Sequence, residues 1–176
     1  MPLPSSTLVL GGAASGKSLY AENLVRDSGG KPVYIATGQA LDEEMQNKIA
    51  LHRHRRGDQW RTVEEPLSLV DALKGNDSAE AAILVDCLTL WLSNLTADGR
   101  DIVGETGKLA EALPSLSAPV VLVSNELGLG VVPQNAAARQ FRNLHGVMNQ
   151  SVAAAVDQVV FVTAGLPSIL KGASGP

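Results

Sequence analysis

The protein has 176 residues and a mass of 18.3 kDa, a common size for one domain that buries about 70% of the surface of its unfolded chain. Hydrophobic residues make up 45% and charged residues 18%, which is typical of a globular protein and excludes a disordered chain. Aromatic residues make up only 3%, and the net charge is -4, so the composition argues against a nucleic acid as partner.

The cysteine content and the amino-terminal sequence indicate in which cellular compartment the protein is expected. Cys87 is the single cysteine and cannot form an internal disulfide, which fits a reducing environment. The amino terminus lacks the basic region of a signal peptide, and no apolar run reaches about 18 residues. We therefore expect a cytoplasmic protein without a membrane span, formed by a single domain over residues 1–176.

Short apolar runs alternate with helical patterns along the chain. The runs are apolar throughout, as expected for strands that are buried on both faces, and the alternation predicts a mostly parallel sheet with helices on both faces. The fold class is therefore α/β. The predicted strands are 7–10, 33–36, 83–85, 120–123 and 159–162. The predicted helices are 17–26, 42–52, 66–73 and 135–156, and loops are expected at 74–80, at 97–107 and after residue 170.

The first predicted strand runs directly into GGAASGKS, at positions 11–18. This sequence fits the phosphate-loop pattern G-x-x-x-x-G-K-[ST], with Gly11, Gly16, Lys17 and Ser18 at the defined positions. The glycines let backbone N–H groups point at phosphate oxygens, and the following helix presents its positive end to the same anion. We expect Lys17 to reach the β- and γ-phosphates and Ser18 to be a ligand of Mg²⁺. A glycine-rich turn without a ligand is the alternative interpretation.

A second part of a nucleotide–metal site follows the third predicted strand, which ends at Asp86. Residues at the carboxyl ends of parallel strands face the ligand crevice, so Asp86 is predicted to hold the hydration shell of Mg²⁺. The alternative is an aspartate that serves only the turn. Asn125 and Glu126 follow the fourth predicted strand and are expected to have a polar role in the same crevice.

The segment 48–66, KIALHRHRRGDQWRTVEEP, carries further chemistry. His52 lies three residues after Ile49 and seven after Met45, which puts the three side chains on one face of the helix predicted there. A neutral imidazole nitrogen can attack a phosphate near neutral pH, and the arginines that follow can neutralise the leaving group.

Other interpretations of these histidines stay open. His52 can also be a structural histidine at a helix C-terminus, followed by a solvated basic loop. His54 and His145 are competing candidates for the nucleophile. His145 lies near the apolar stripe of the last predicted helix, where packing is the expected role.

Taken together, these motifs resemble the bifunctional adenosylcobinamide kinase and adenosylcobinamide-phosphate guanylyltransferase family of cobalamin biosynthesis. The resemblance covers almost the whole chain, and its histidine segment and the motif VSNELGLGVVP are the specific parts. The matching motifs are GGAASGKS, YIATGQALDEEM from Tyr34, KIALHRHRRGDQWRTVEEP, DCLTLWLSNL from Asp86, VSNELGLGVVP from Val123, RQFRNLHGVMNQ from Arg139, and AGLP from Ala164.

The resemblance implies a single P-loop NTPase domain, RecA-like in fold, with two reactions at one nucleotide site. ATP or GTP phosphorylates the aminopropanol hydroxyl of adenosylcobinamide; GMP is then transferred from GTP to adenosylcobinamide phosphate. It also implies that His52 is guanylylated during the transfer, that Lys17 is catalytic, that Ser18 and Asp86 hold Mg²⁺, and that the chain forms a homo-oligomer, a trimer. The implied nucleotide contacts are Gly11, Gly12, Ala13, Ala14, Ser15, Gly16, Lys17, Ser18, Ile35, Ala36, Thr37, Arg53, His54, Arg55, Arg56, Glu64 and Asp86.

One position departs from the family pattern, because Ala14 stands where the family usually has arginine. The missing charge puts the relative rates or the nucleotide preference in doubt more than the fold. Glu64 is of the right type to accept the N1–H and N2–H₂ donors of guanine, which adenine lacks; an exposed carboxylate in a turn is the alternative.

Two other functions compete with the bifunctional enzyme. The first is a kinase alone, with the basic loop as a phosphate clamp and His52 as a structural residue. The second is a nucleotide-binding switch without catalysis.

The two reactions of the bifunctional enzyme need attack at different phosphates. Phosphorylation needs attack at the γ-phosphate and guanylylation needs attack at the α-phosphate, and one fixed phosphate-binding loop cannot position both. Either the nucleotide binds in two poses or the loop with His52 moves, with Gly38 and Gly57 as candidate hinges.

Overall fold

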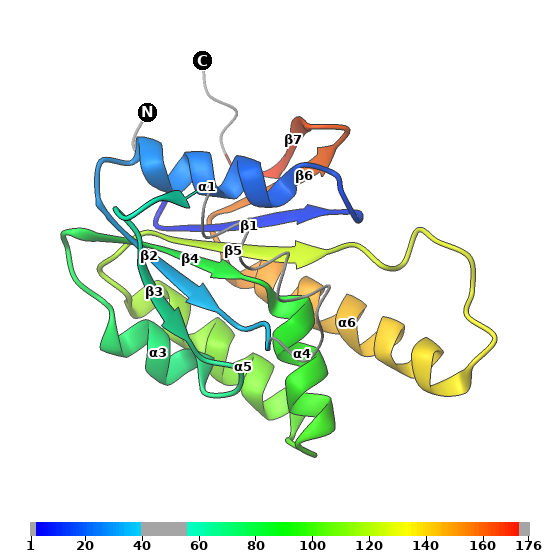
Figure 1. The fold of residues 1–176 in the computed structure, drawn as a ribbon. Helices are drawn as coiled ribbons and strands as arrows, with labels where there is room; N and C mark the ends of the chain where they lie inside the picture. Colours follow the sequence, from blue (N-terminus) through cyan, green and yellow to red (C-terminus); the bar gives the residue numbers. More distant parts are fainter. Residues whose placement is uncertain (1–2, 40–55, 173–176) are drawn as a thin grey trace.

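The computed structural model describes residues 3–39 and 56–172, and in these residues seven strands form one sheet. The strand order is β3-β2-β4-β5-β1-β6-β7; all neighbouring pairs are parallel except β6 and β7 (Figure 1). The strands are β1 (Ser6–Gly11), β2 (Lys31–Ala36), β3 (Arg61–Glu64), β4 (Ala81–Asp86), β5 (Val120–Asn125), β6 (Gln158–Thr163) and β7 (Leu166–Lys171).

Helices cover both faces of this sheet, as the sequence predicts. Among the described residues, one helix lies on the first face and four lie on the second (Figure 1). They are α1 (Lys17–Asp27) on the first face, and α3 (Leu69–Gly75), α4 (Leu88–Ala97), α5 (Ile102–Ala112) and α6 (Ala136–Ala155) on the second. In the described part of the chain, no helix is both long and apolar enough to cross a bilayer.

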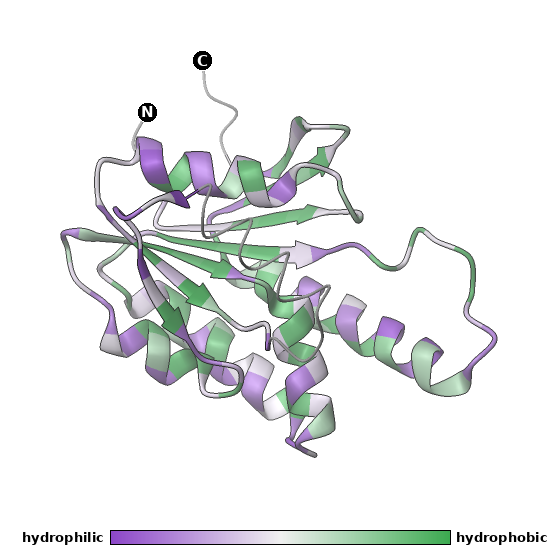
Figure 2. Ribbon diagram, viewed as in Figure 1, coloured by the Kyte–Doolittle hydropathy of each residue, from purple (hydrophilic) through white to green (hydrophobic). Residues whose placement is uncertain are grey.

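The central strands are buried on both sides, which confirms the interpretation of the continuous apolar runs. Figure 2 shows them as a hydrophobic layer between helices whose outer faces are hydrophilic. Side chains alternate between two core clusters, so Val9 and Leu84 face α1, whereas Leu8 and Ile83 face the other helices. All five predicted strands occur, as β1, β2, β4, β5 and β6.

The last long helix agrees with its prediction. Residues 135–156 are predicted to be helical, and α6 spans almost all of that range. Asn135 caps it, because its side-chain oxygen accepts from the N–H groups of Ala137 and Ala138. Gly146 lies inside the helix without ending it, as expected.

Two predicted boundaries are wrong, and the first concerns the loop expected over 97–107. Helix α5 begins at Ile102, inside that range. The carboxylate of Asp101 accepts a hydrogen bond from the N–H of Gly104 and so caps the helix. The N-cap and the buried face formed by Thr106, Leu109 and Ala112 stabilise the helix where a loop was expected.

The second wrong boundary is the start of the helix predicted over 66–73, which begins at Leu69 instead. The Glu65 carboxylate accepts hydrogen bonds from the N–H groups of Leu67, at 2.9 Å, and Ser68, at 2.8 Å. These bonds hold a turn before the helix, so the proline lies ahead of the first helical turn.

Besides α5, three elements have no counterpart among the predicted ones. Strand β3 is four residues long, with the sequence RTVE, and shows no apolar run. Strand β7 is exposed along its whole length. Helix α4 does carry a helical signal, because its buried residues follow the i, i+3, i+4, i+7 spacing: Leu88, Trp91, Leu92 and Leu95.

Candidate functional site

The phosphate-loop sequence forms the turn between β1 and α1. Gly16 lies at the N-cap of α1 with φ of 92°, a conformation that favours glycine. The Lys17 ammonium donates to the backbone oxygen of Gly12 at 2.9 Å, so the lysine side chain folds back over the loop. The predicted strand–loop–helix context of the motif is confirmed, and the positive end of α1 faces whatever the loop binds.

A second turn packs against this loop. Ala164 and Gly165 join β6 to β7 with φ of 52° and 78°, and the N–H of Gly165 donates to the carbonyl of Ser15 at 2.8 Å. A Cβ atom added to Gly16 would lie 3.1 Å from the Gly165 Cα. The motif AGLP therefore supports the phosphate loop. The sequence shows this motif but does not indicate that it packs against the phosphate loop.

Asp86 lies at the carboxyl end of β4, in one row with two other predicted site residues. In the pairing of β2 with its neighbours, Ala36 is opposite both Asp86 and Glu64. Neighbours in parallel register point to the same face, and the alternation along β4 puts Asp86 on the face of Leu84, which is the α1 face. The carboxylates of Glu64 and Asp86 thus belong to the same edge as the phosphate loop.

Thr37, which follows β2, supports the peptide that follows Asp86. Its hydroxyl donates to the carbonyl of Cys87 at 2.7 Å and accepts from the N–H of Cys87 at 2.9 Å. The peptide bond between Asp86 and Cys87 is cis. The Thr37 side chain is fully buried, and its hydroxyl holds the protein backbone. The nucleotide contact that the resemblance implies for this residue stays a prediction. Ile35 is also fully buried, in the core on the opposite face from the phosphate loop.

Arg56 is buried against α1 and β2. Its guanidinium lies 3.4 Å from the centroid of the Tyr34 ring and 3.6 Å from the carboxylate of Glu22. The side chains of Arg56 and Glu22 are 3% and 0% exposed. Burial raises the pKa of the Tyr34 hydroxyl, and the charge of nearby Asp86 acts in the same direction. The structure therefore places Arg56 in the packed layer on the α1 face, and the nucleotide contact that the resemblance implies for it stays a prediction.

The other residues of the basic segment, His52, Arg53, His54 and Arg55, lie outside the described residues. Their predicted roles as nucleophile and nucleotide contacts thus stay predictions. Gly57, one candidate hinge, has φ of 72°.

The chemistry of the available donors fits Mg²⁺. Ser18 supplies a hydroxyl in the first turn of α1, and Asp86 supplies a carboxylate from the same face of the sheet. Mg²⁺ is usually held by one or two protein oxygens together with water and substrate phosphates, not by a cage of protein ligands. No group of three or more His, Cys, Asp or Glu side chains suited to a metal occurs in the described ranges.

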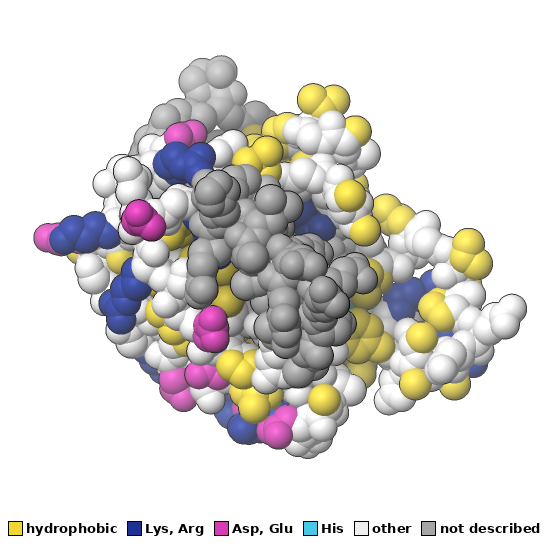
Figure 3. Space-filling model, in the orientation of Figure 1, with side chains coloured by type: hydrophobic (Ala, Val, Ile, Leu, Met, Phe, Trp, Pro, Cys, Tyr) yellow, Lys and Arg dark blue, Asp and Glu magenta, His cyan; other side chains and the backbone are white. Residues whose placement is uncertain are grey.

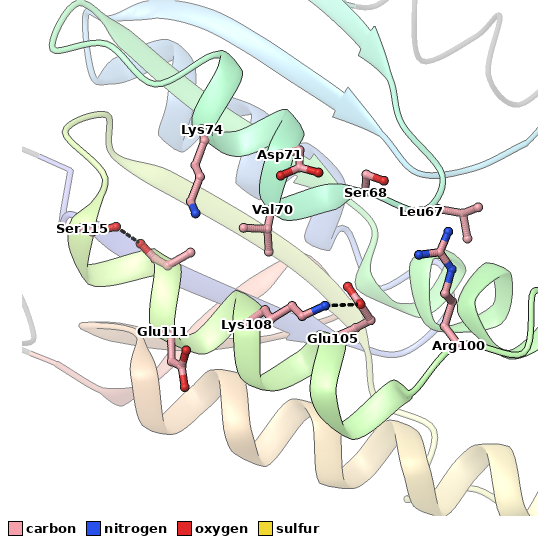
Figure 4. Close-up of a pocket in the computed structure, with 11 residues that line it drawn as sticks. Leu67, Ser68, Val70, Asp71, Lys74, Arg100, Glu105, Lys108, Glu111 and Ser115 are labelled. Carbon is pink, nitrogen blue, oxygen red and sulfur yellow. Dashed lines mark hydrogen bonds and ion pairs between the residues drawn. The ribbon is translucent and has the colours of Figure 1, made fainter.

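A groove of about 500 Å³ lies away from this edge, between α3 and α5 (Figure 4). No predicted site residue lines it. Lys108 and Glu105 form an ion pair there at 2.7 Å, and the two other acidic and two other basic residues of the lining balance one another. The groove has no net charge that would attract an anion.

The family model described as cobinamide kinase / cobinamide phosphate guanyltransferase matches residues 7–170 of this chain. The chain belongs to this family. A relative from Pseudomonas aeruginosa, named bifunctional adenosylcobalamin biosynthesis protein CobP, is 48% identical over 94% of this chain and 96% of its own length. The Escherichia coli K12 protein named bifunctional adenosylcobalamin biosynthesis protein CobU is 40% identical, over 93% and 98% of the two chains. The motif resemblance is therefore confirmed, and the chain is an enzyme of a bifunctional kinase and guanylyltransferase family.

Solved structures agree on the fold. A solved ATPase domain superposes with a TM-score of 0.55 over 97% of this chain and 78% of that one, at 12% identity. The RadB recombinase gives 0.50 over 90% and 74%, at 17% identity. These likenesses confirm the predicted RecA-like P-loop NTPase fold, which, with the family, implies nucleotide binding.

Proposed function

We propose that the protein phosphorylates the aminopropanol hydroxyl of adenosylcobinamide with ATP or GTP and then converts adenosylcobinamide phosphate to adenosylcobinamide-GDP. The observation that carries this proposal is the shared edge of phosphate loop, Asp86 and Glu64 in a chain that belongs to the family. Acidic composition and few aromatic residues argue for a small-molecule substrate and against a nucleic acid.

In the kinase step, the protein positions the nucleotide and neutralises its charge. Backbone N–H groups of the phosphate loop and the N-terminus of α1 would hold the phosphates, and the Lys17 ammonium would exchange its contact with Gly12 for a phosphate oxygen. The acceptor oxygen forms a bond to the γ-phosphorus, the bond from that phosphorus to the β–γ bridging oxygen breaks, and the hydroxyl proton passes to solvent water. Ser18 and Asp86 would hold Mg²⁺, which supplies charge neutralisation on the phosphates when bound.

In the transfer step, His52 is the proposed nucleophile, because its segment matches the family motif. A ring nitrogen of His52 forms a bond to the α-phosphorus of GTP, and the α–β bridging bond breaks to release pyrophosphate. An oxygen of the substrate phosphate then bonds to the same phosphorus, and the N–P bond breaks to free His52. Glu64 is proposed to accept hydrogen bonds from guanine, since it lies at the exposed end of β3.

We also propose a homo-oligomer, a trimer, formed in the cytoplasm by chains that each consist of one domain. The loop between β5 and α6 extends from the body of the molecule (Figure 1), and Figure 3 shows several separate apolar side chains among polar ones on the part that projects at the right. Leu129, Val131 and Val132 on this loop are 82%, 95% and 59% exposed. Exposed apolar side chains that share one loop favour a contact with another chain.

Intact-protein mass spectrometry after incubation with GTP and Mg²⁺ tests the transfer step. We expect wild type and His54→Ala to gain one acid-labile GMP unit and His52→Ala to gain none. If wild type binds nucleotide and phosphorylates the acceptor but gains no mass, a kinase alone is the better description. If His54→Ala is the variant that fails, the nucleophile is assigned wrongly. Turnover that never depends on the acceptor would favour a nucleotide-binding switch.

A further inference from the structure

Helix α6 buries a histidine in a position where an apolar side chain would cost less. His145 is 1% exposed and lies on the same helix face as Met148 and Val152, in the core beneath the sheet. Asn149, one turn later, is buried as well. Buried polar side chains destabilise a core unless they form hydrogen bonds, so the partners of this pair indicate what it does.

All partners of the pair lie at the edge of the sheet that carries the candidate site. His145 Nε2 is 2.9 Å from the hydroxyl oxygen of Thr89, in the first turn of α4 after Asp86. Ser124, at the end of β5, donates to Asn149 Oδ1 at 2.7 Å.

The network ends on Asn125, which it holds at three atoms. Thr89 Oγ1 accepts from the backbone N–H of Asn125, at 3.0 Å, and from its side-chain Nδ2, at 3.1 Å. The carbonyl of Asn125 accepts from Asn149 Nδ2 at 3.0 Å. No other residue at this end of β5 receives so many side-chain hydrogen bonds in the described part of the chain.

Counting donors and acceptors shows why the histidine matters. A hydroxyl has one proton and two acceptor positions. His145 has three polar neighbours: Thr89 Oγ1 at 2.9 Å and Ser124 Oγ at 3.3 Å from Nε2, and Asn149 Nδ2 at 3.4 Å from Nδ1. The Thr89 contact is the shortest of the three. Because Asn125 occupies both acceptor positions of Thr89 Oγ1, we take the Thr89 proton as the donor in this contact and Nε2 as the acceptor. Burial lowers the pKa of His145, so the imidazole is neutral at neutral pH and Nε2 can accept that proton. The imidazole thereby fixes the rotation of the hydroxyl that orients the Asn125 amide.

The backbone of Asn125 lies beside the first residue of the phosphate loop. Strand β5 lies between β1 and β4, and Asn125 is opposite Gly11, the first residue of the loop. The N–H of the following residue, Glu126, donates to the carbonyl of Gly11 at 3.0 Å. One N–H of the Asn125 amide is used by Thr89, so the second can donate to an acceptor such as a phosphate oxygen.

We infer that His145 is a positioning residue of this site, which acts through Thr89 to hold the Asn125 amide as a hydrogen-bond donor to a phosphate oxygen of the bound nucleotide. The inference rests on the proposed function, because its main test measures the proposed kinase activity. It concerns the kinase step, in which that phosphate group carries developing charge.

A double-mutant cycle with Asn125→Ala and His145→Met tests the inference. Methionine fills the histidine volume without accepting a proton from Thr89. Phosphorylation of adenosylcobinamide by ATP is measured under saturating conditions. We expect kcat to fall about 100-fold in Asn125→Ala and about tenfold in His145→Met, with the KM for adenosylcobinamide little changed. Because both changes remove the same donor, the double variant should match Asn125→Ala within about threefold.

Two further variants separate positioning from packing. His145→Gln offers an amide oxygen to Thr89 and should retain more kcat than His145→Met. Val147→Ala, on the exposed side of the same helix, should leave kcat unchanged. The inference is overturned if the two effects multiply in the double variant, if His145→Met lowers only thermal stability, or if the defect is confined to the transfer of GMP.

Failure of the proposed function would look different. Wild type would then transfer no phosphate to adenosylcobinamide. In that case the same double-mutant cycle is carried out on the affinity for ATP with Mg²⁺, which calorimetry measures without an acceptor. Non-additive losses of affinity in the same variants support the positioning role, and equal affinities in wild type and Asn125→Ala overturn it.

Discussion

The two faces of the sheet carry different kinds of buried polar cluster beside the same edge. On the α1 face, the guanidinium of Arg56 lies against the Glu22 carboxylate and the Tyr34 ring. On the α6 face, His145 and Asn149 form hydrogen bonds within a network whose groups are neutral. Removing Arg56 takes a cation away from a buried carboxylate, whereas removing a neutral group leaves only polar atoms without a partner. The comparison therefore predicts that changes on the α1 face cost more.

Arg56→Met should be the most destabilising of the changes considered. We expect the free energy of unfolding to fall by about 3–5 kcal/mol, because the buried Glu22 carboxylate loses the guanidinium. Methionine keeps an apolar contact with the Tyr34 ring, so the loss reports mainly on charge. Urea denaturation of the full chain measures it.

Two controls sharpen this result. Adding Glu22→Gln to Arg56→Met should restore part of the stability, since a neutral amide is less costly to bury than a carboxylate. Arg26→Met, at an exposed position of α1, the helix that carries Glu22, should change the free energy of unfolding by no more than about 0.5 kcal/mol. A double variant that is no more stable than Arg56→Met would show that the ionic contact is not what stabilises this face.

Asn149→Leu breaks the neutral cluster and should cost less. The Ser124 hydroxyl and the Asn125 carbonyl each lose a partner, so we expect a loss of about 1–3 kcal/mol by urea denaturation. Gln150→Ala, at the exposed neighbouring position, serves as the matched control. The proposed difference between the faces would be contradicted if Asn149→Leu destabilised the protein as much as Arg56→Met.

The sequence predicts those parts of the site that depend on neighbours in the chain. The phosphate loop is a local pattern between an apolar run and a helix, so its glycines, Lys17 and Ser18 could be located directly. Asp86 could be placed because a buried strand ends there, and a parallel sheet puts such ends at one edge. The fold class follows from the same apolar runs.

The supporting contacts could not be predicted, because they join residues that are distant in sequence. Thr37 and Cys87 are 50 positions apart, and Thr89 and His145 are 56 apart. Glutamates on helices usually face solvent, yet Glu22 is fully buried, with the Arg56 guanidinium 3.6 Å from its carboxylate. Register and packing decide these contacts, and residue type alone does not indicate them.

The smallest predicted effect is a pH dependence on the α6 face. Burial lowers the pKa of His145, and the charge of Glu126 opposes this in part. As pH falls through the usual range of histidine, the unfolded chain therefore binds more protons than the folded chain, and stability falls. A protonated ring also cannot accept the Thr89 proton. Between about pH 7.5 and about pH 5.5, wild type should lose more unfolding free energy than His145→Met, which has no titrating group there.

The difference between the two proteins isolates this histidine, because every other titrating group is common to both. Urea denaturation at the two pH values gives four free energies, and the quantity that matters is the change in wild type minus the change in His145→Met. A larger loss in wild type supports a buried neutral histidine that must be deprotonated to hold Thr89. Equal changes in the two proteins would show that His145 keeps its usual pKa in the folded state, and the contrast between a charged face and a neutral face would then be lost.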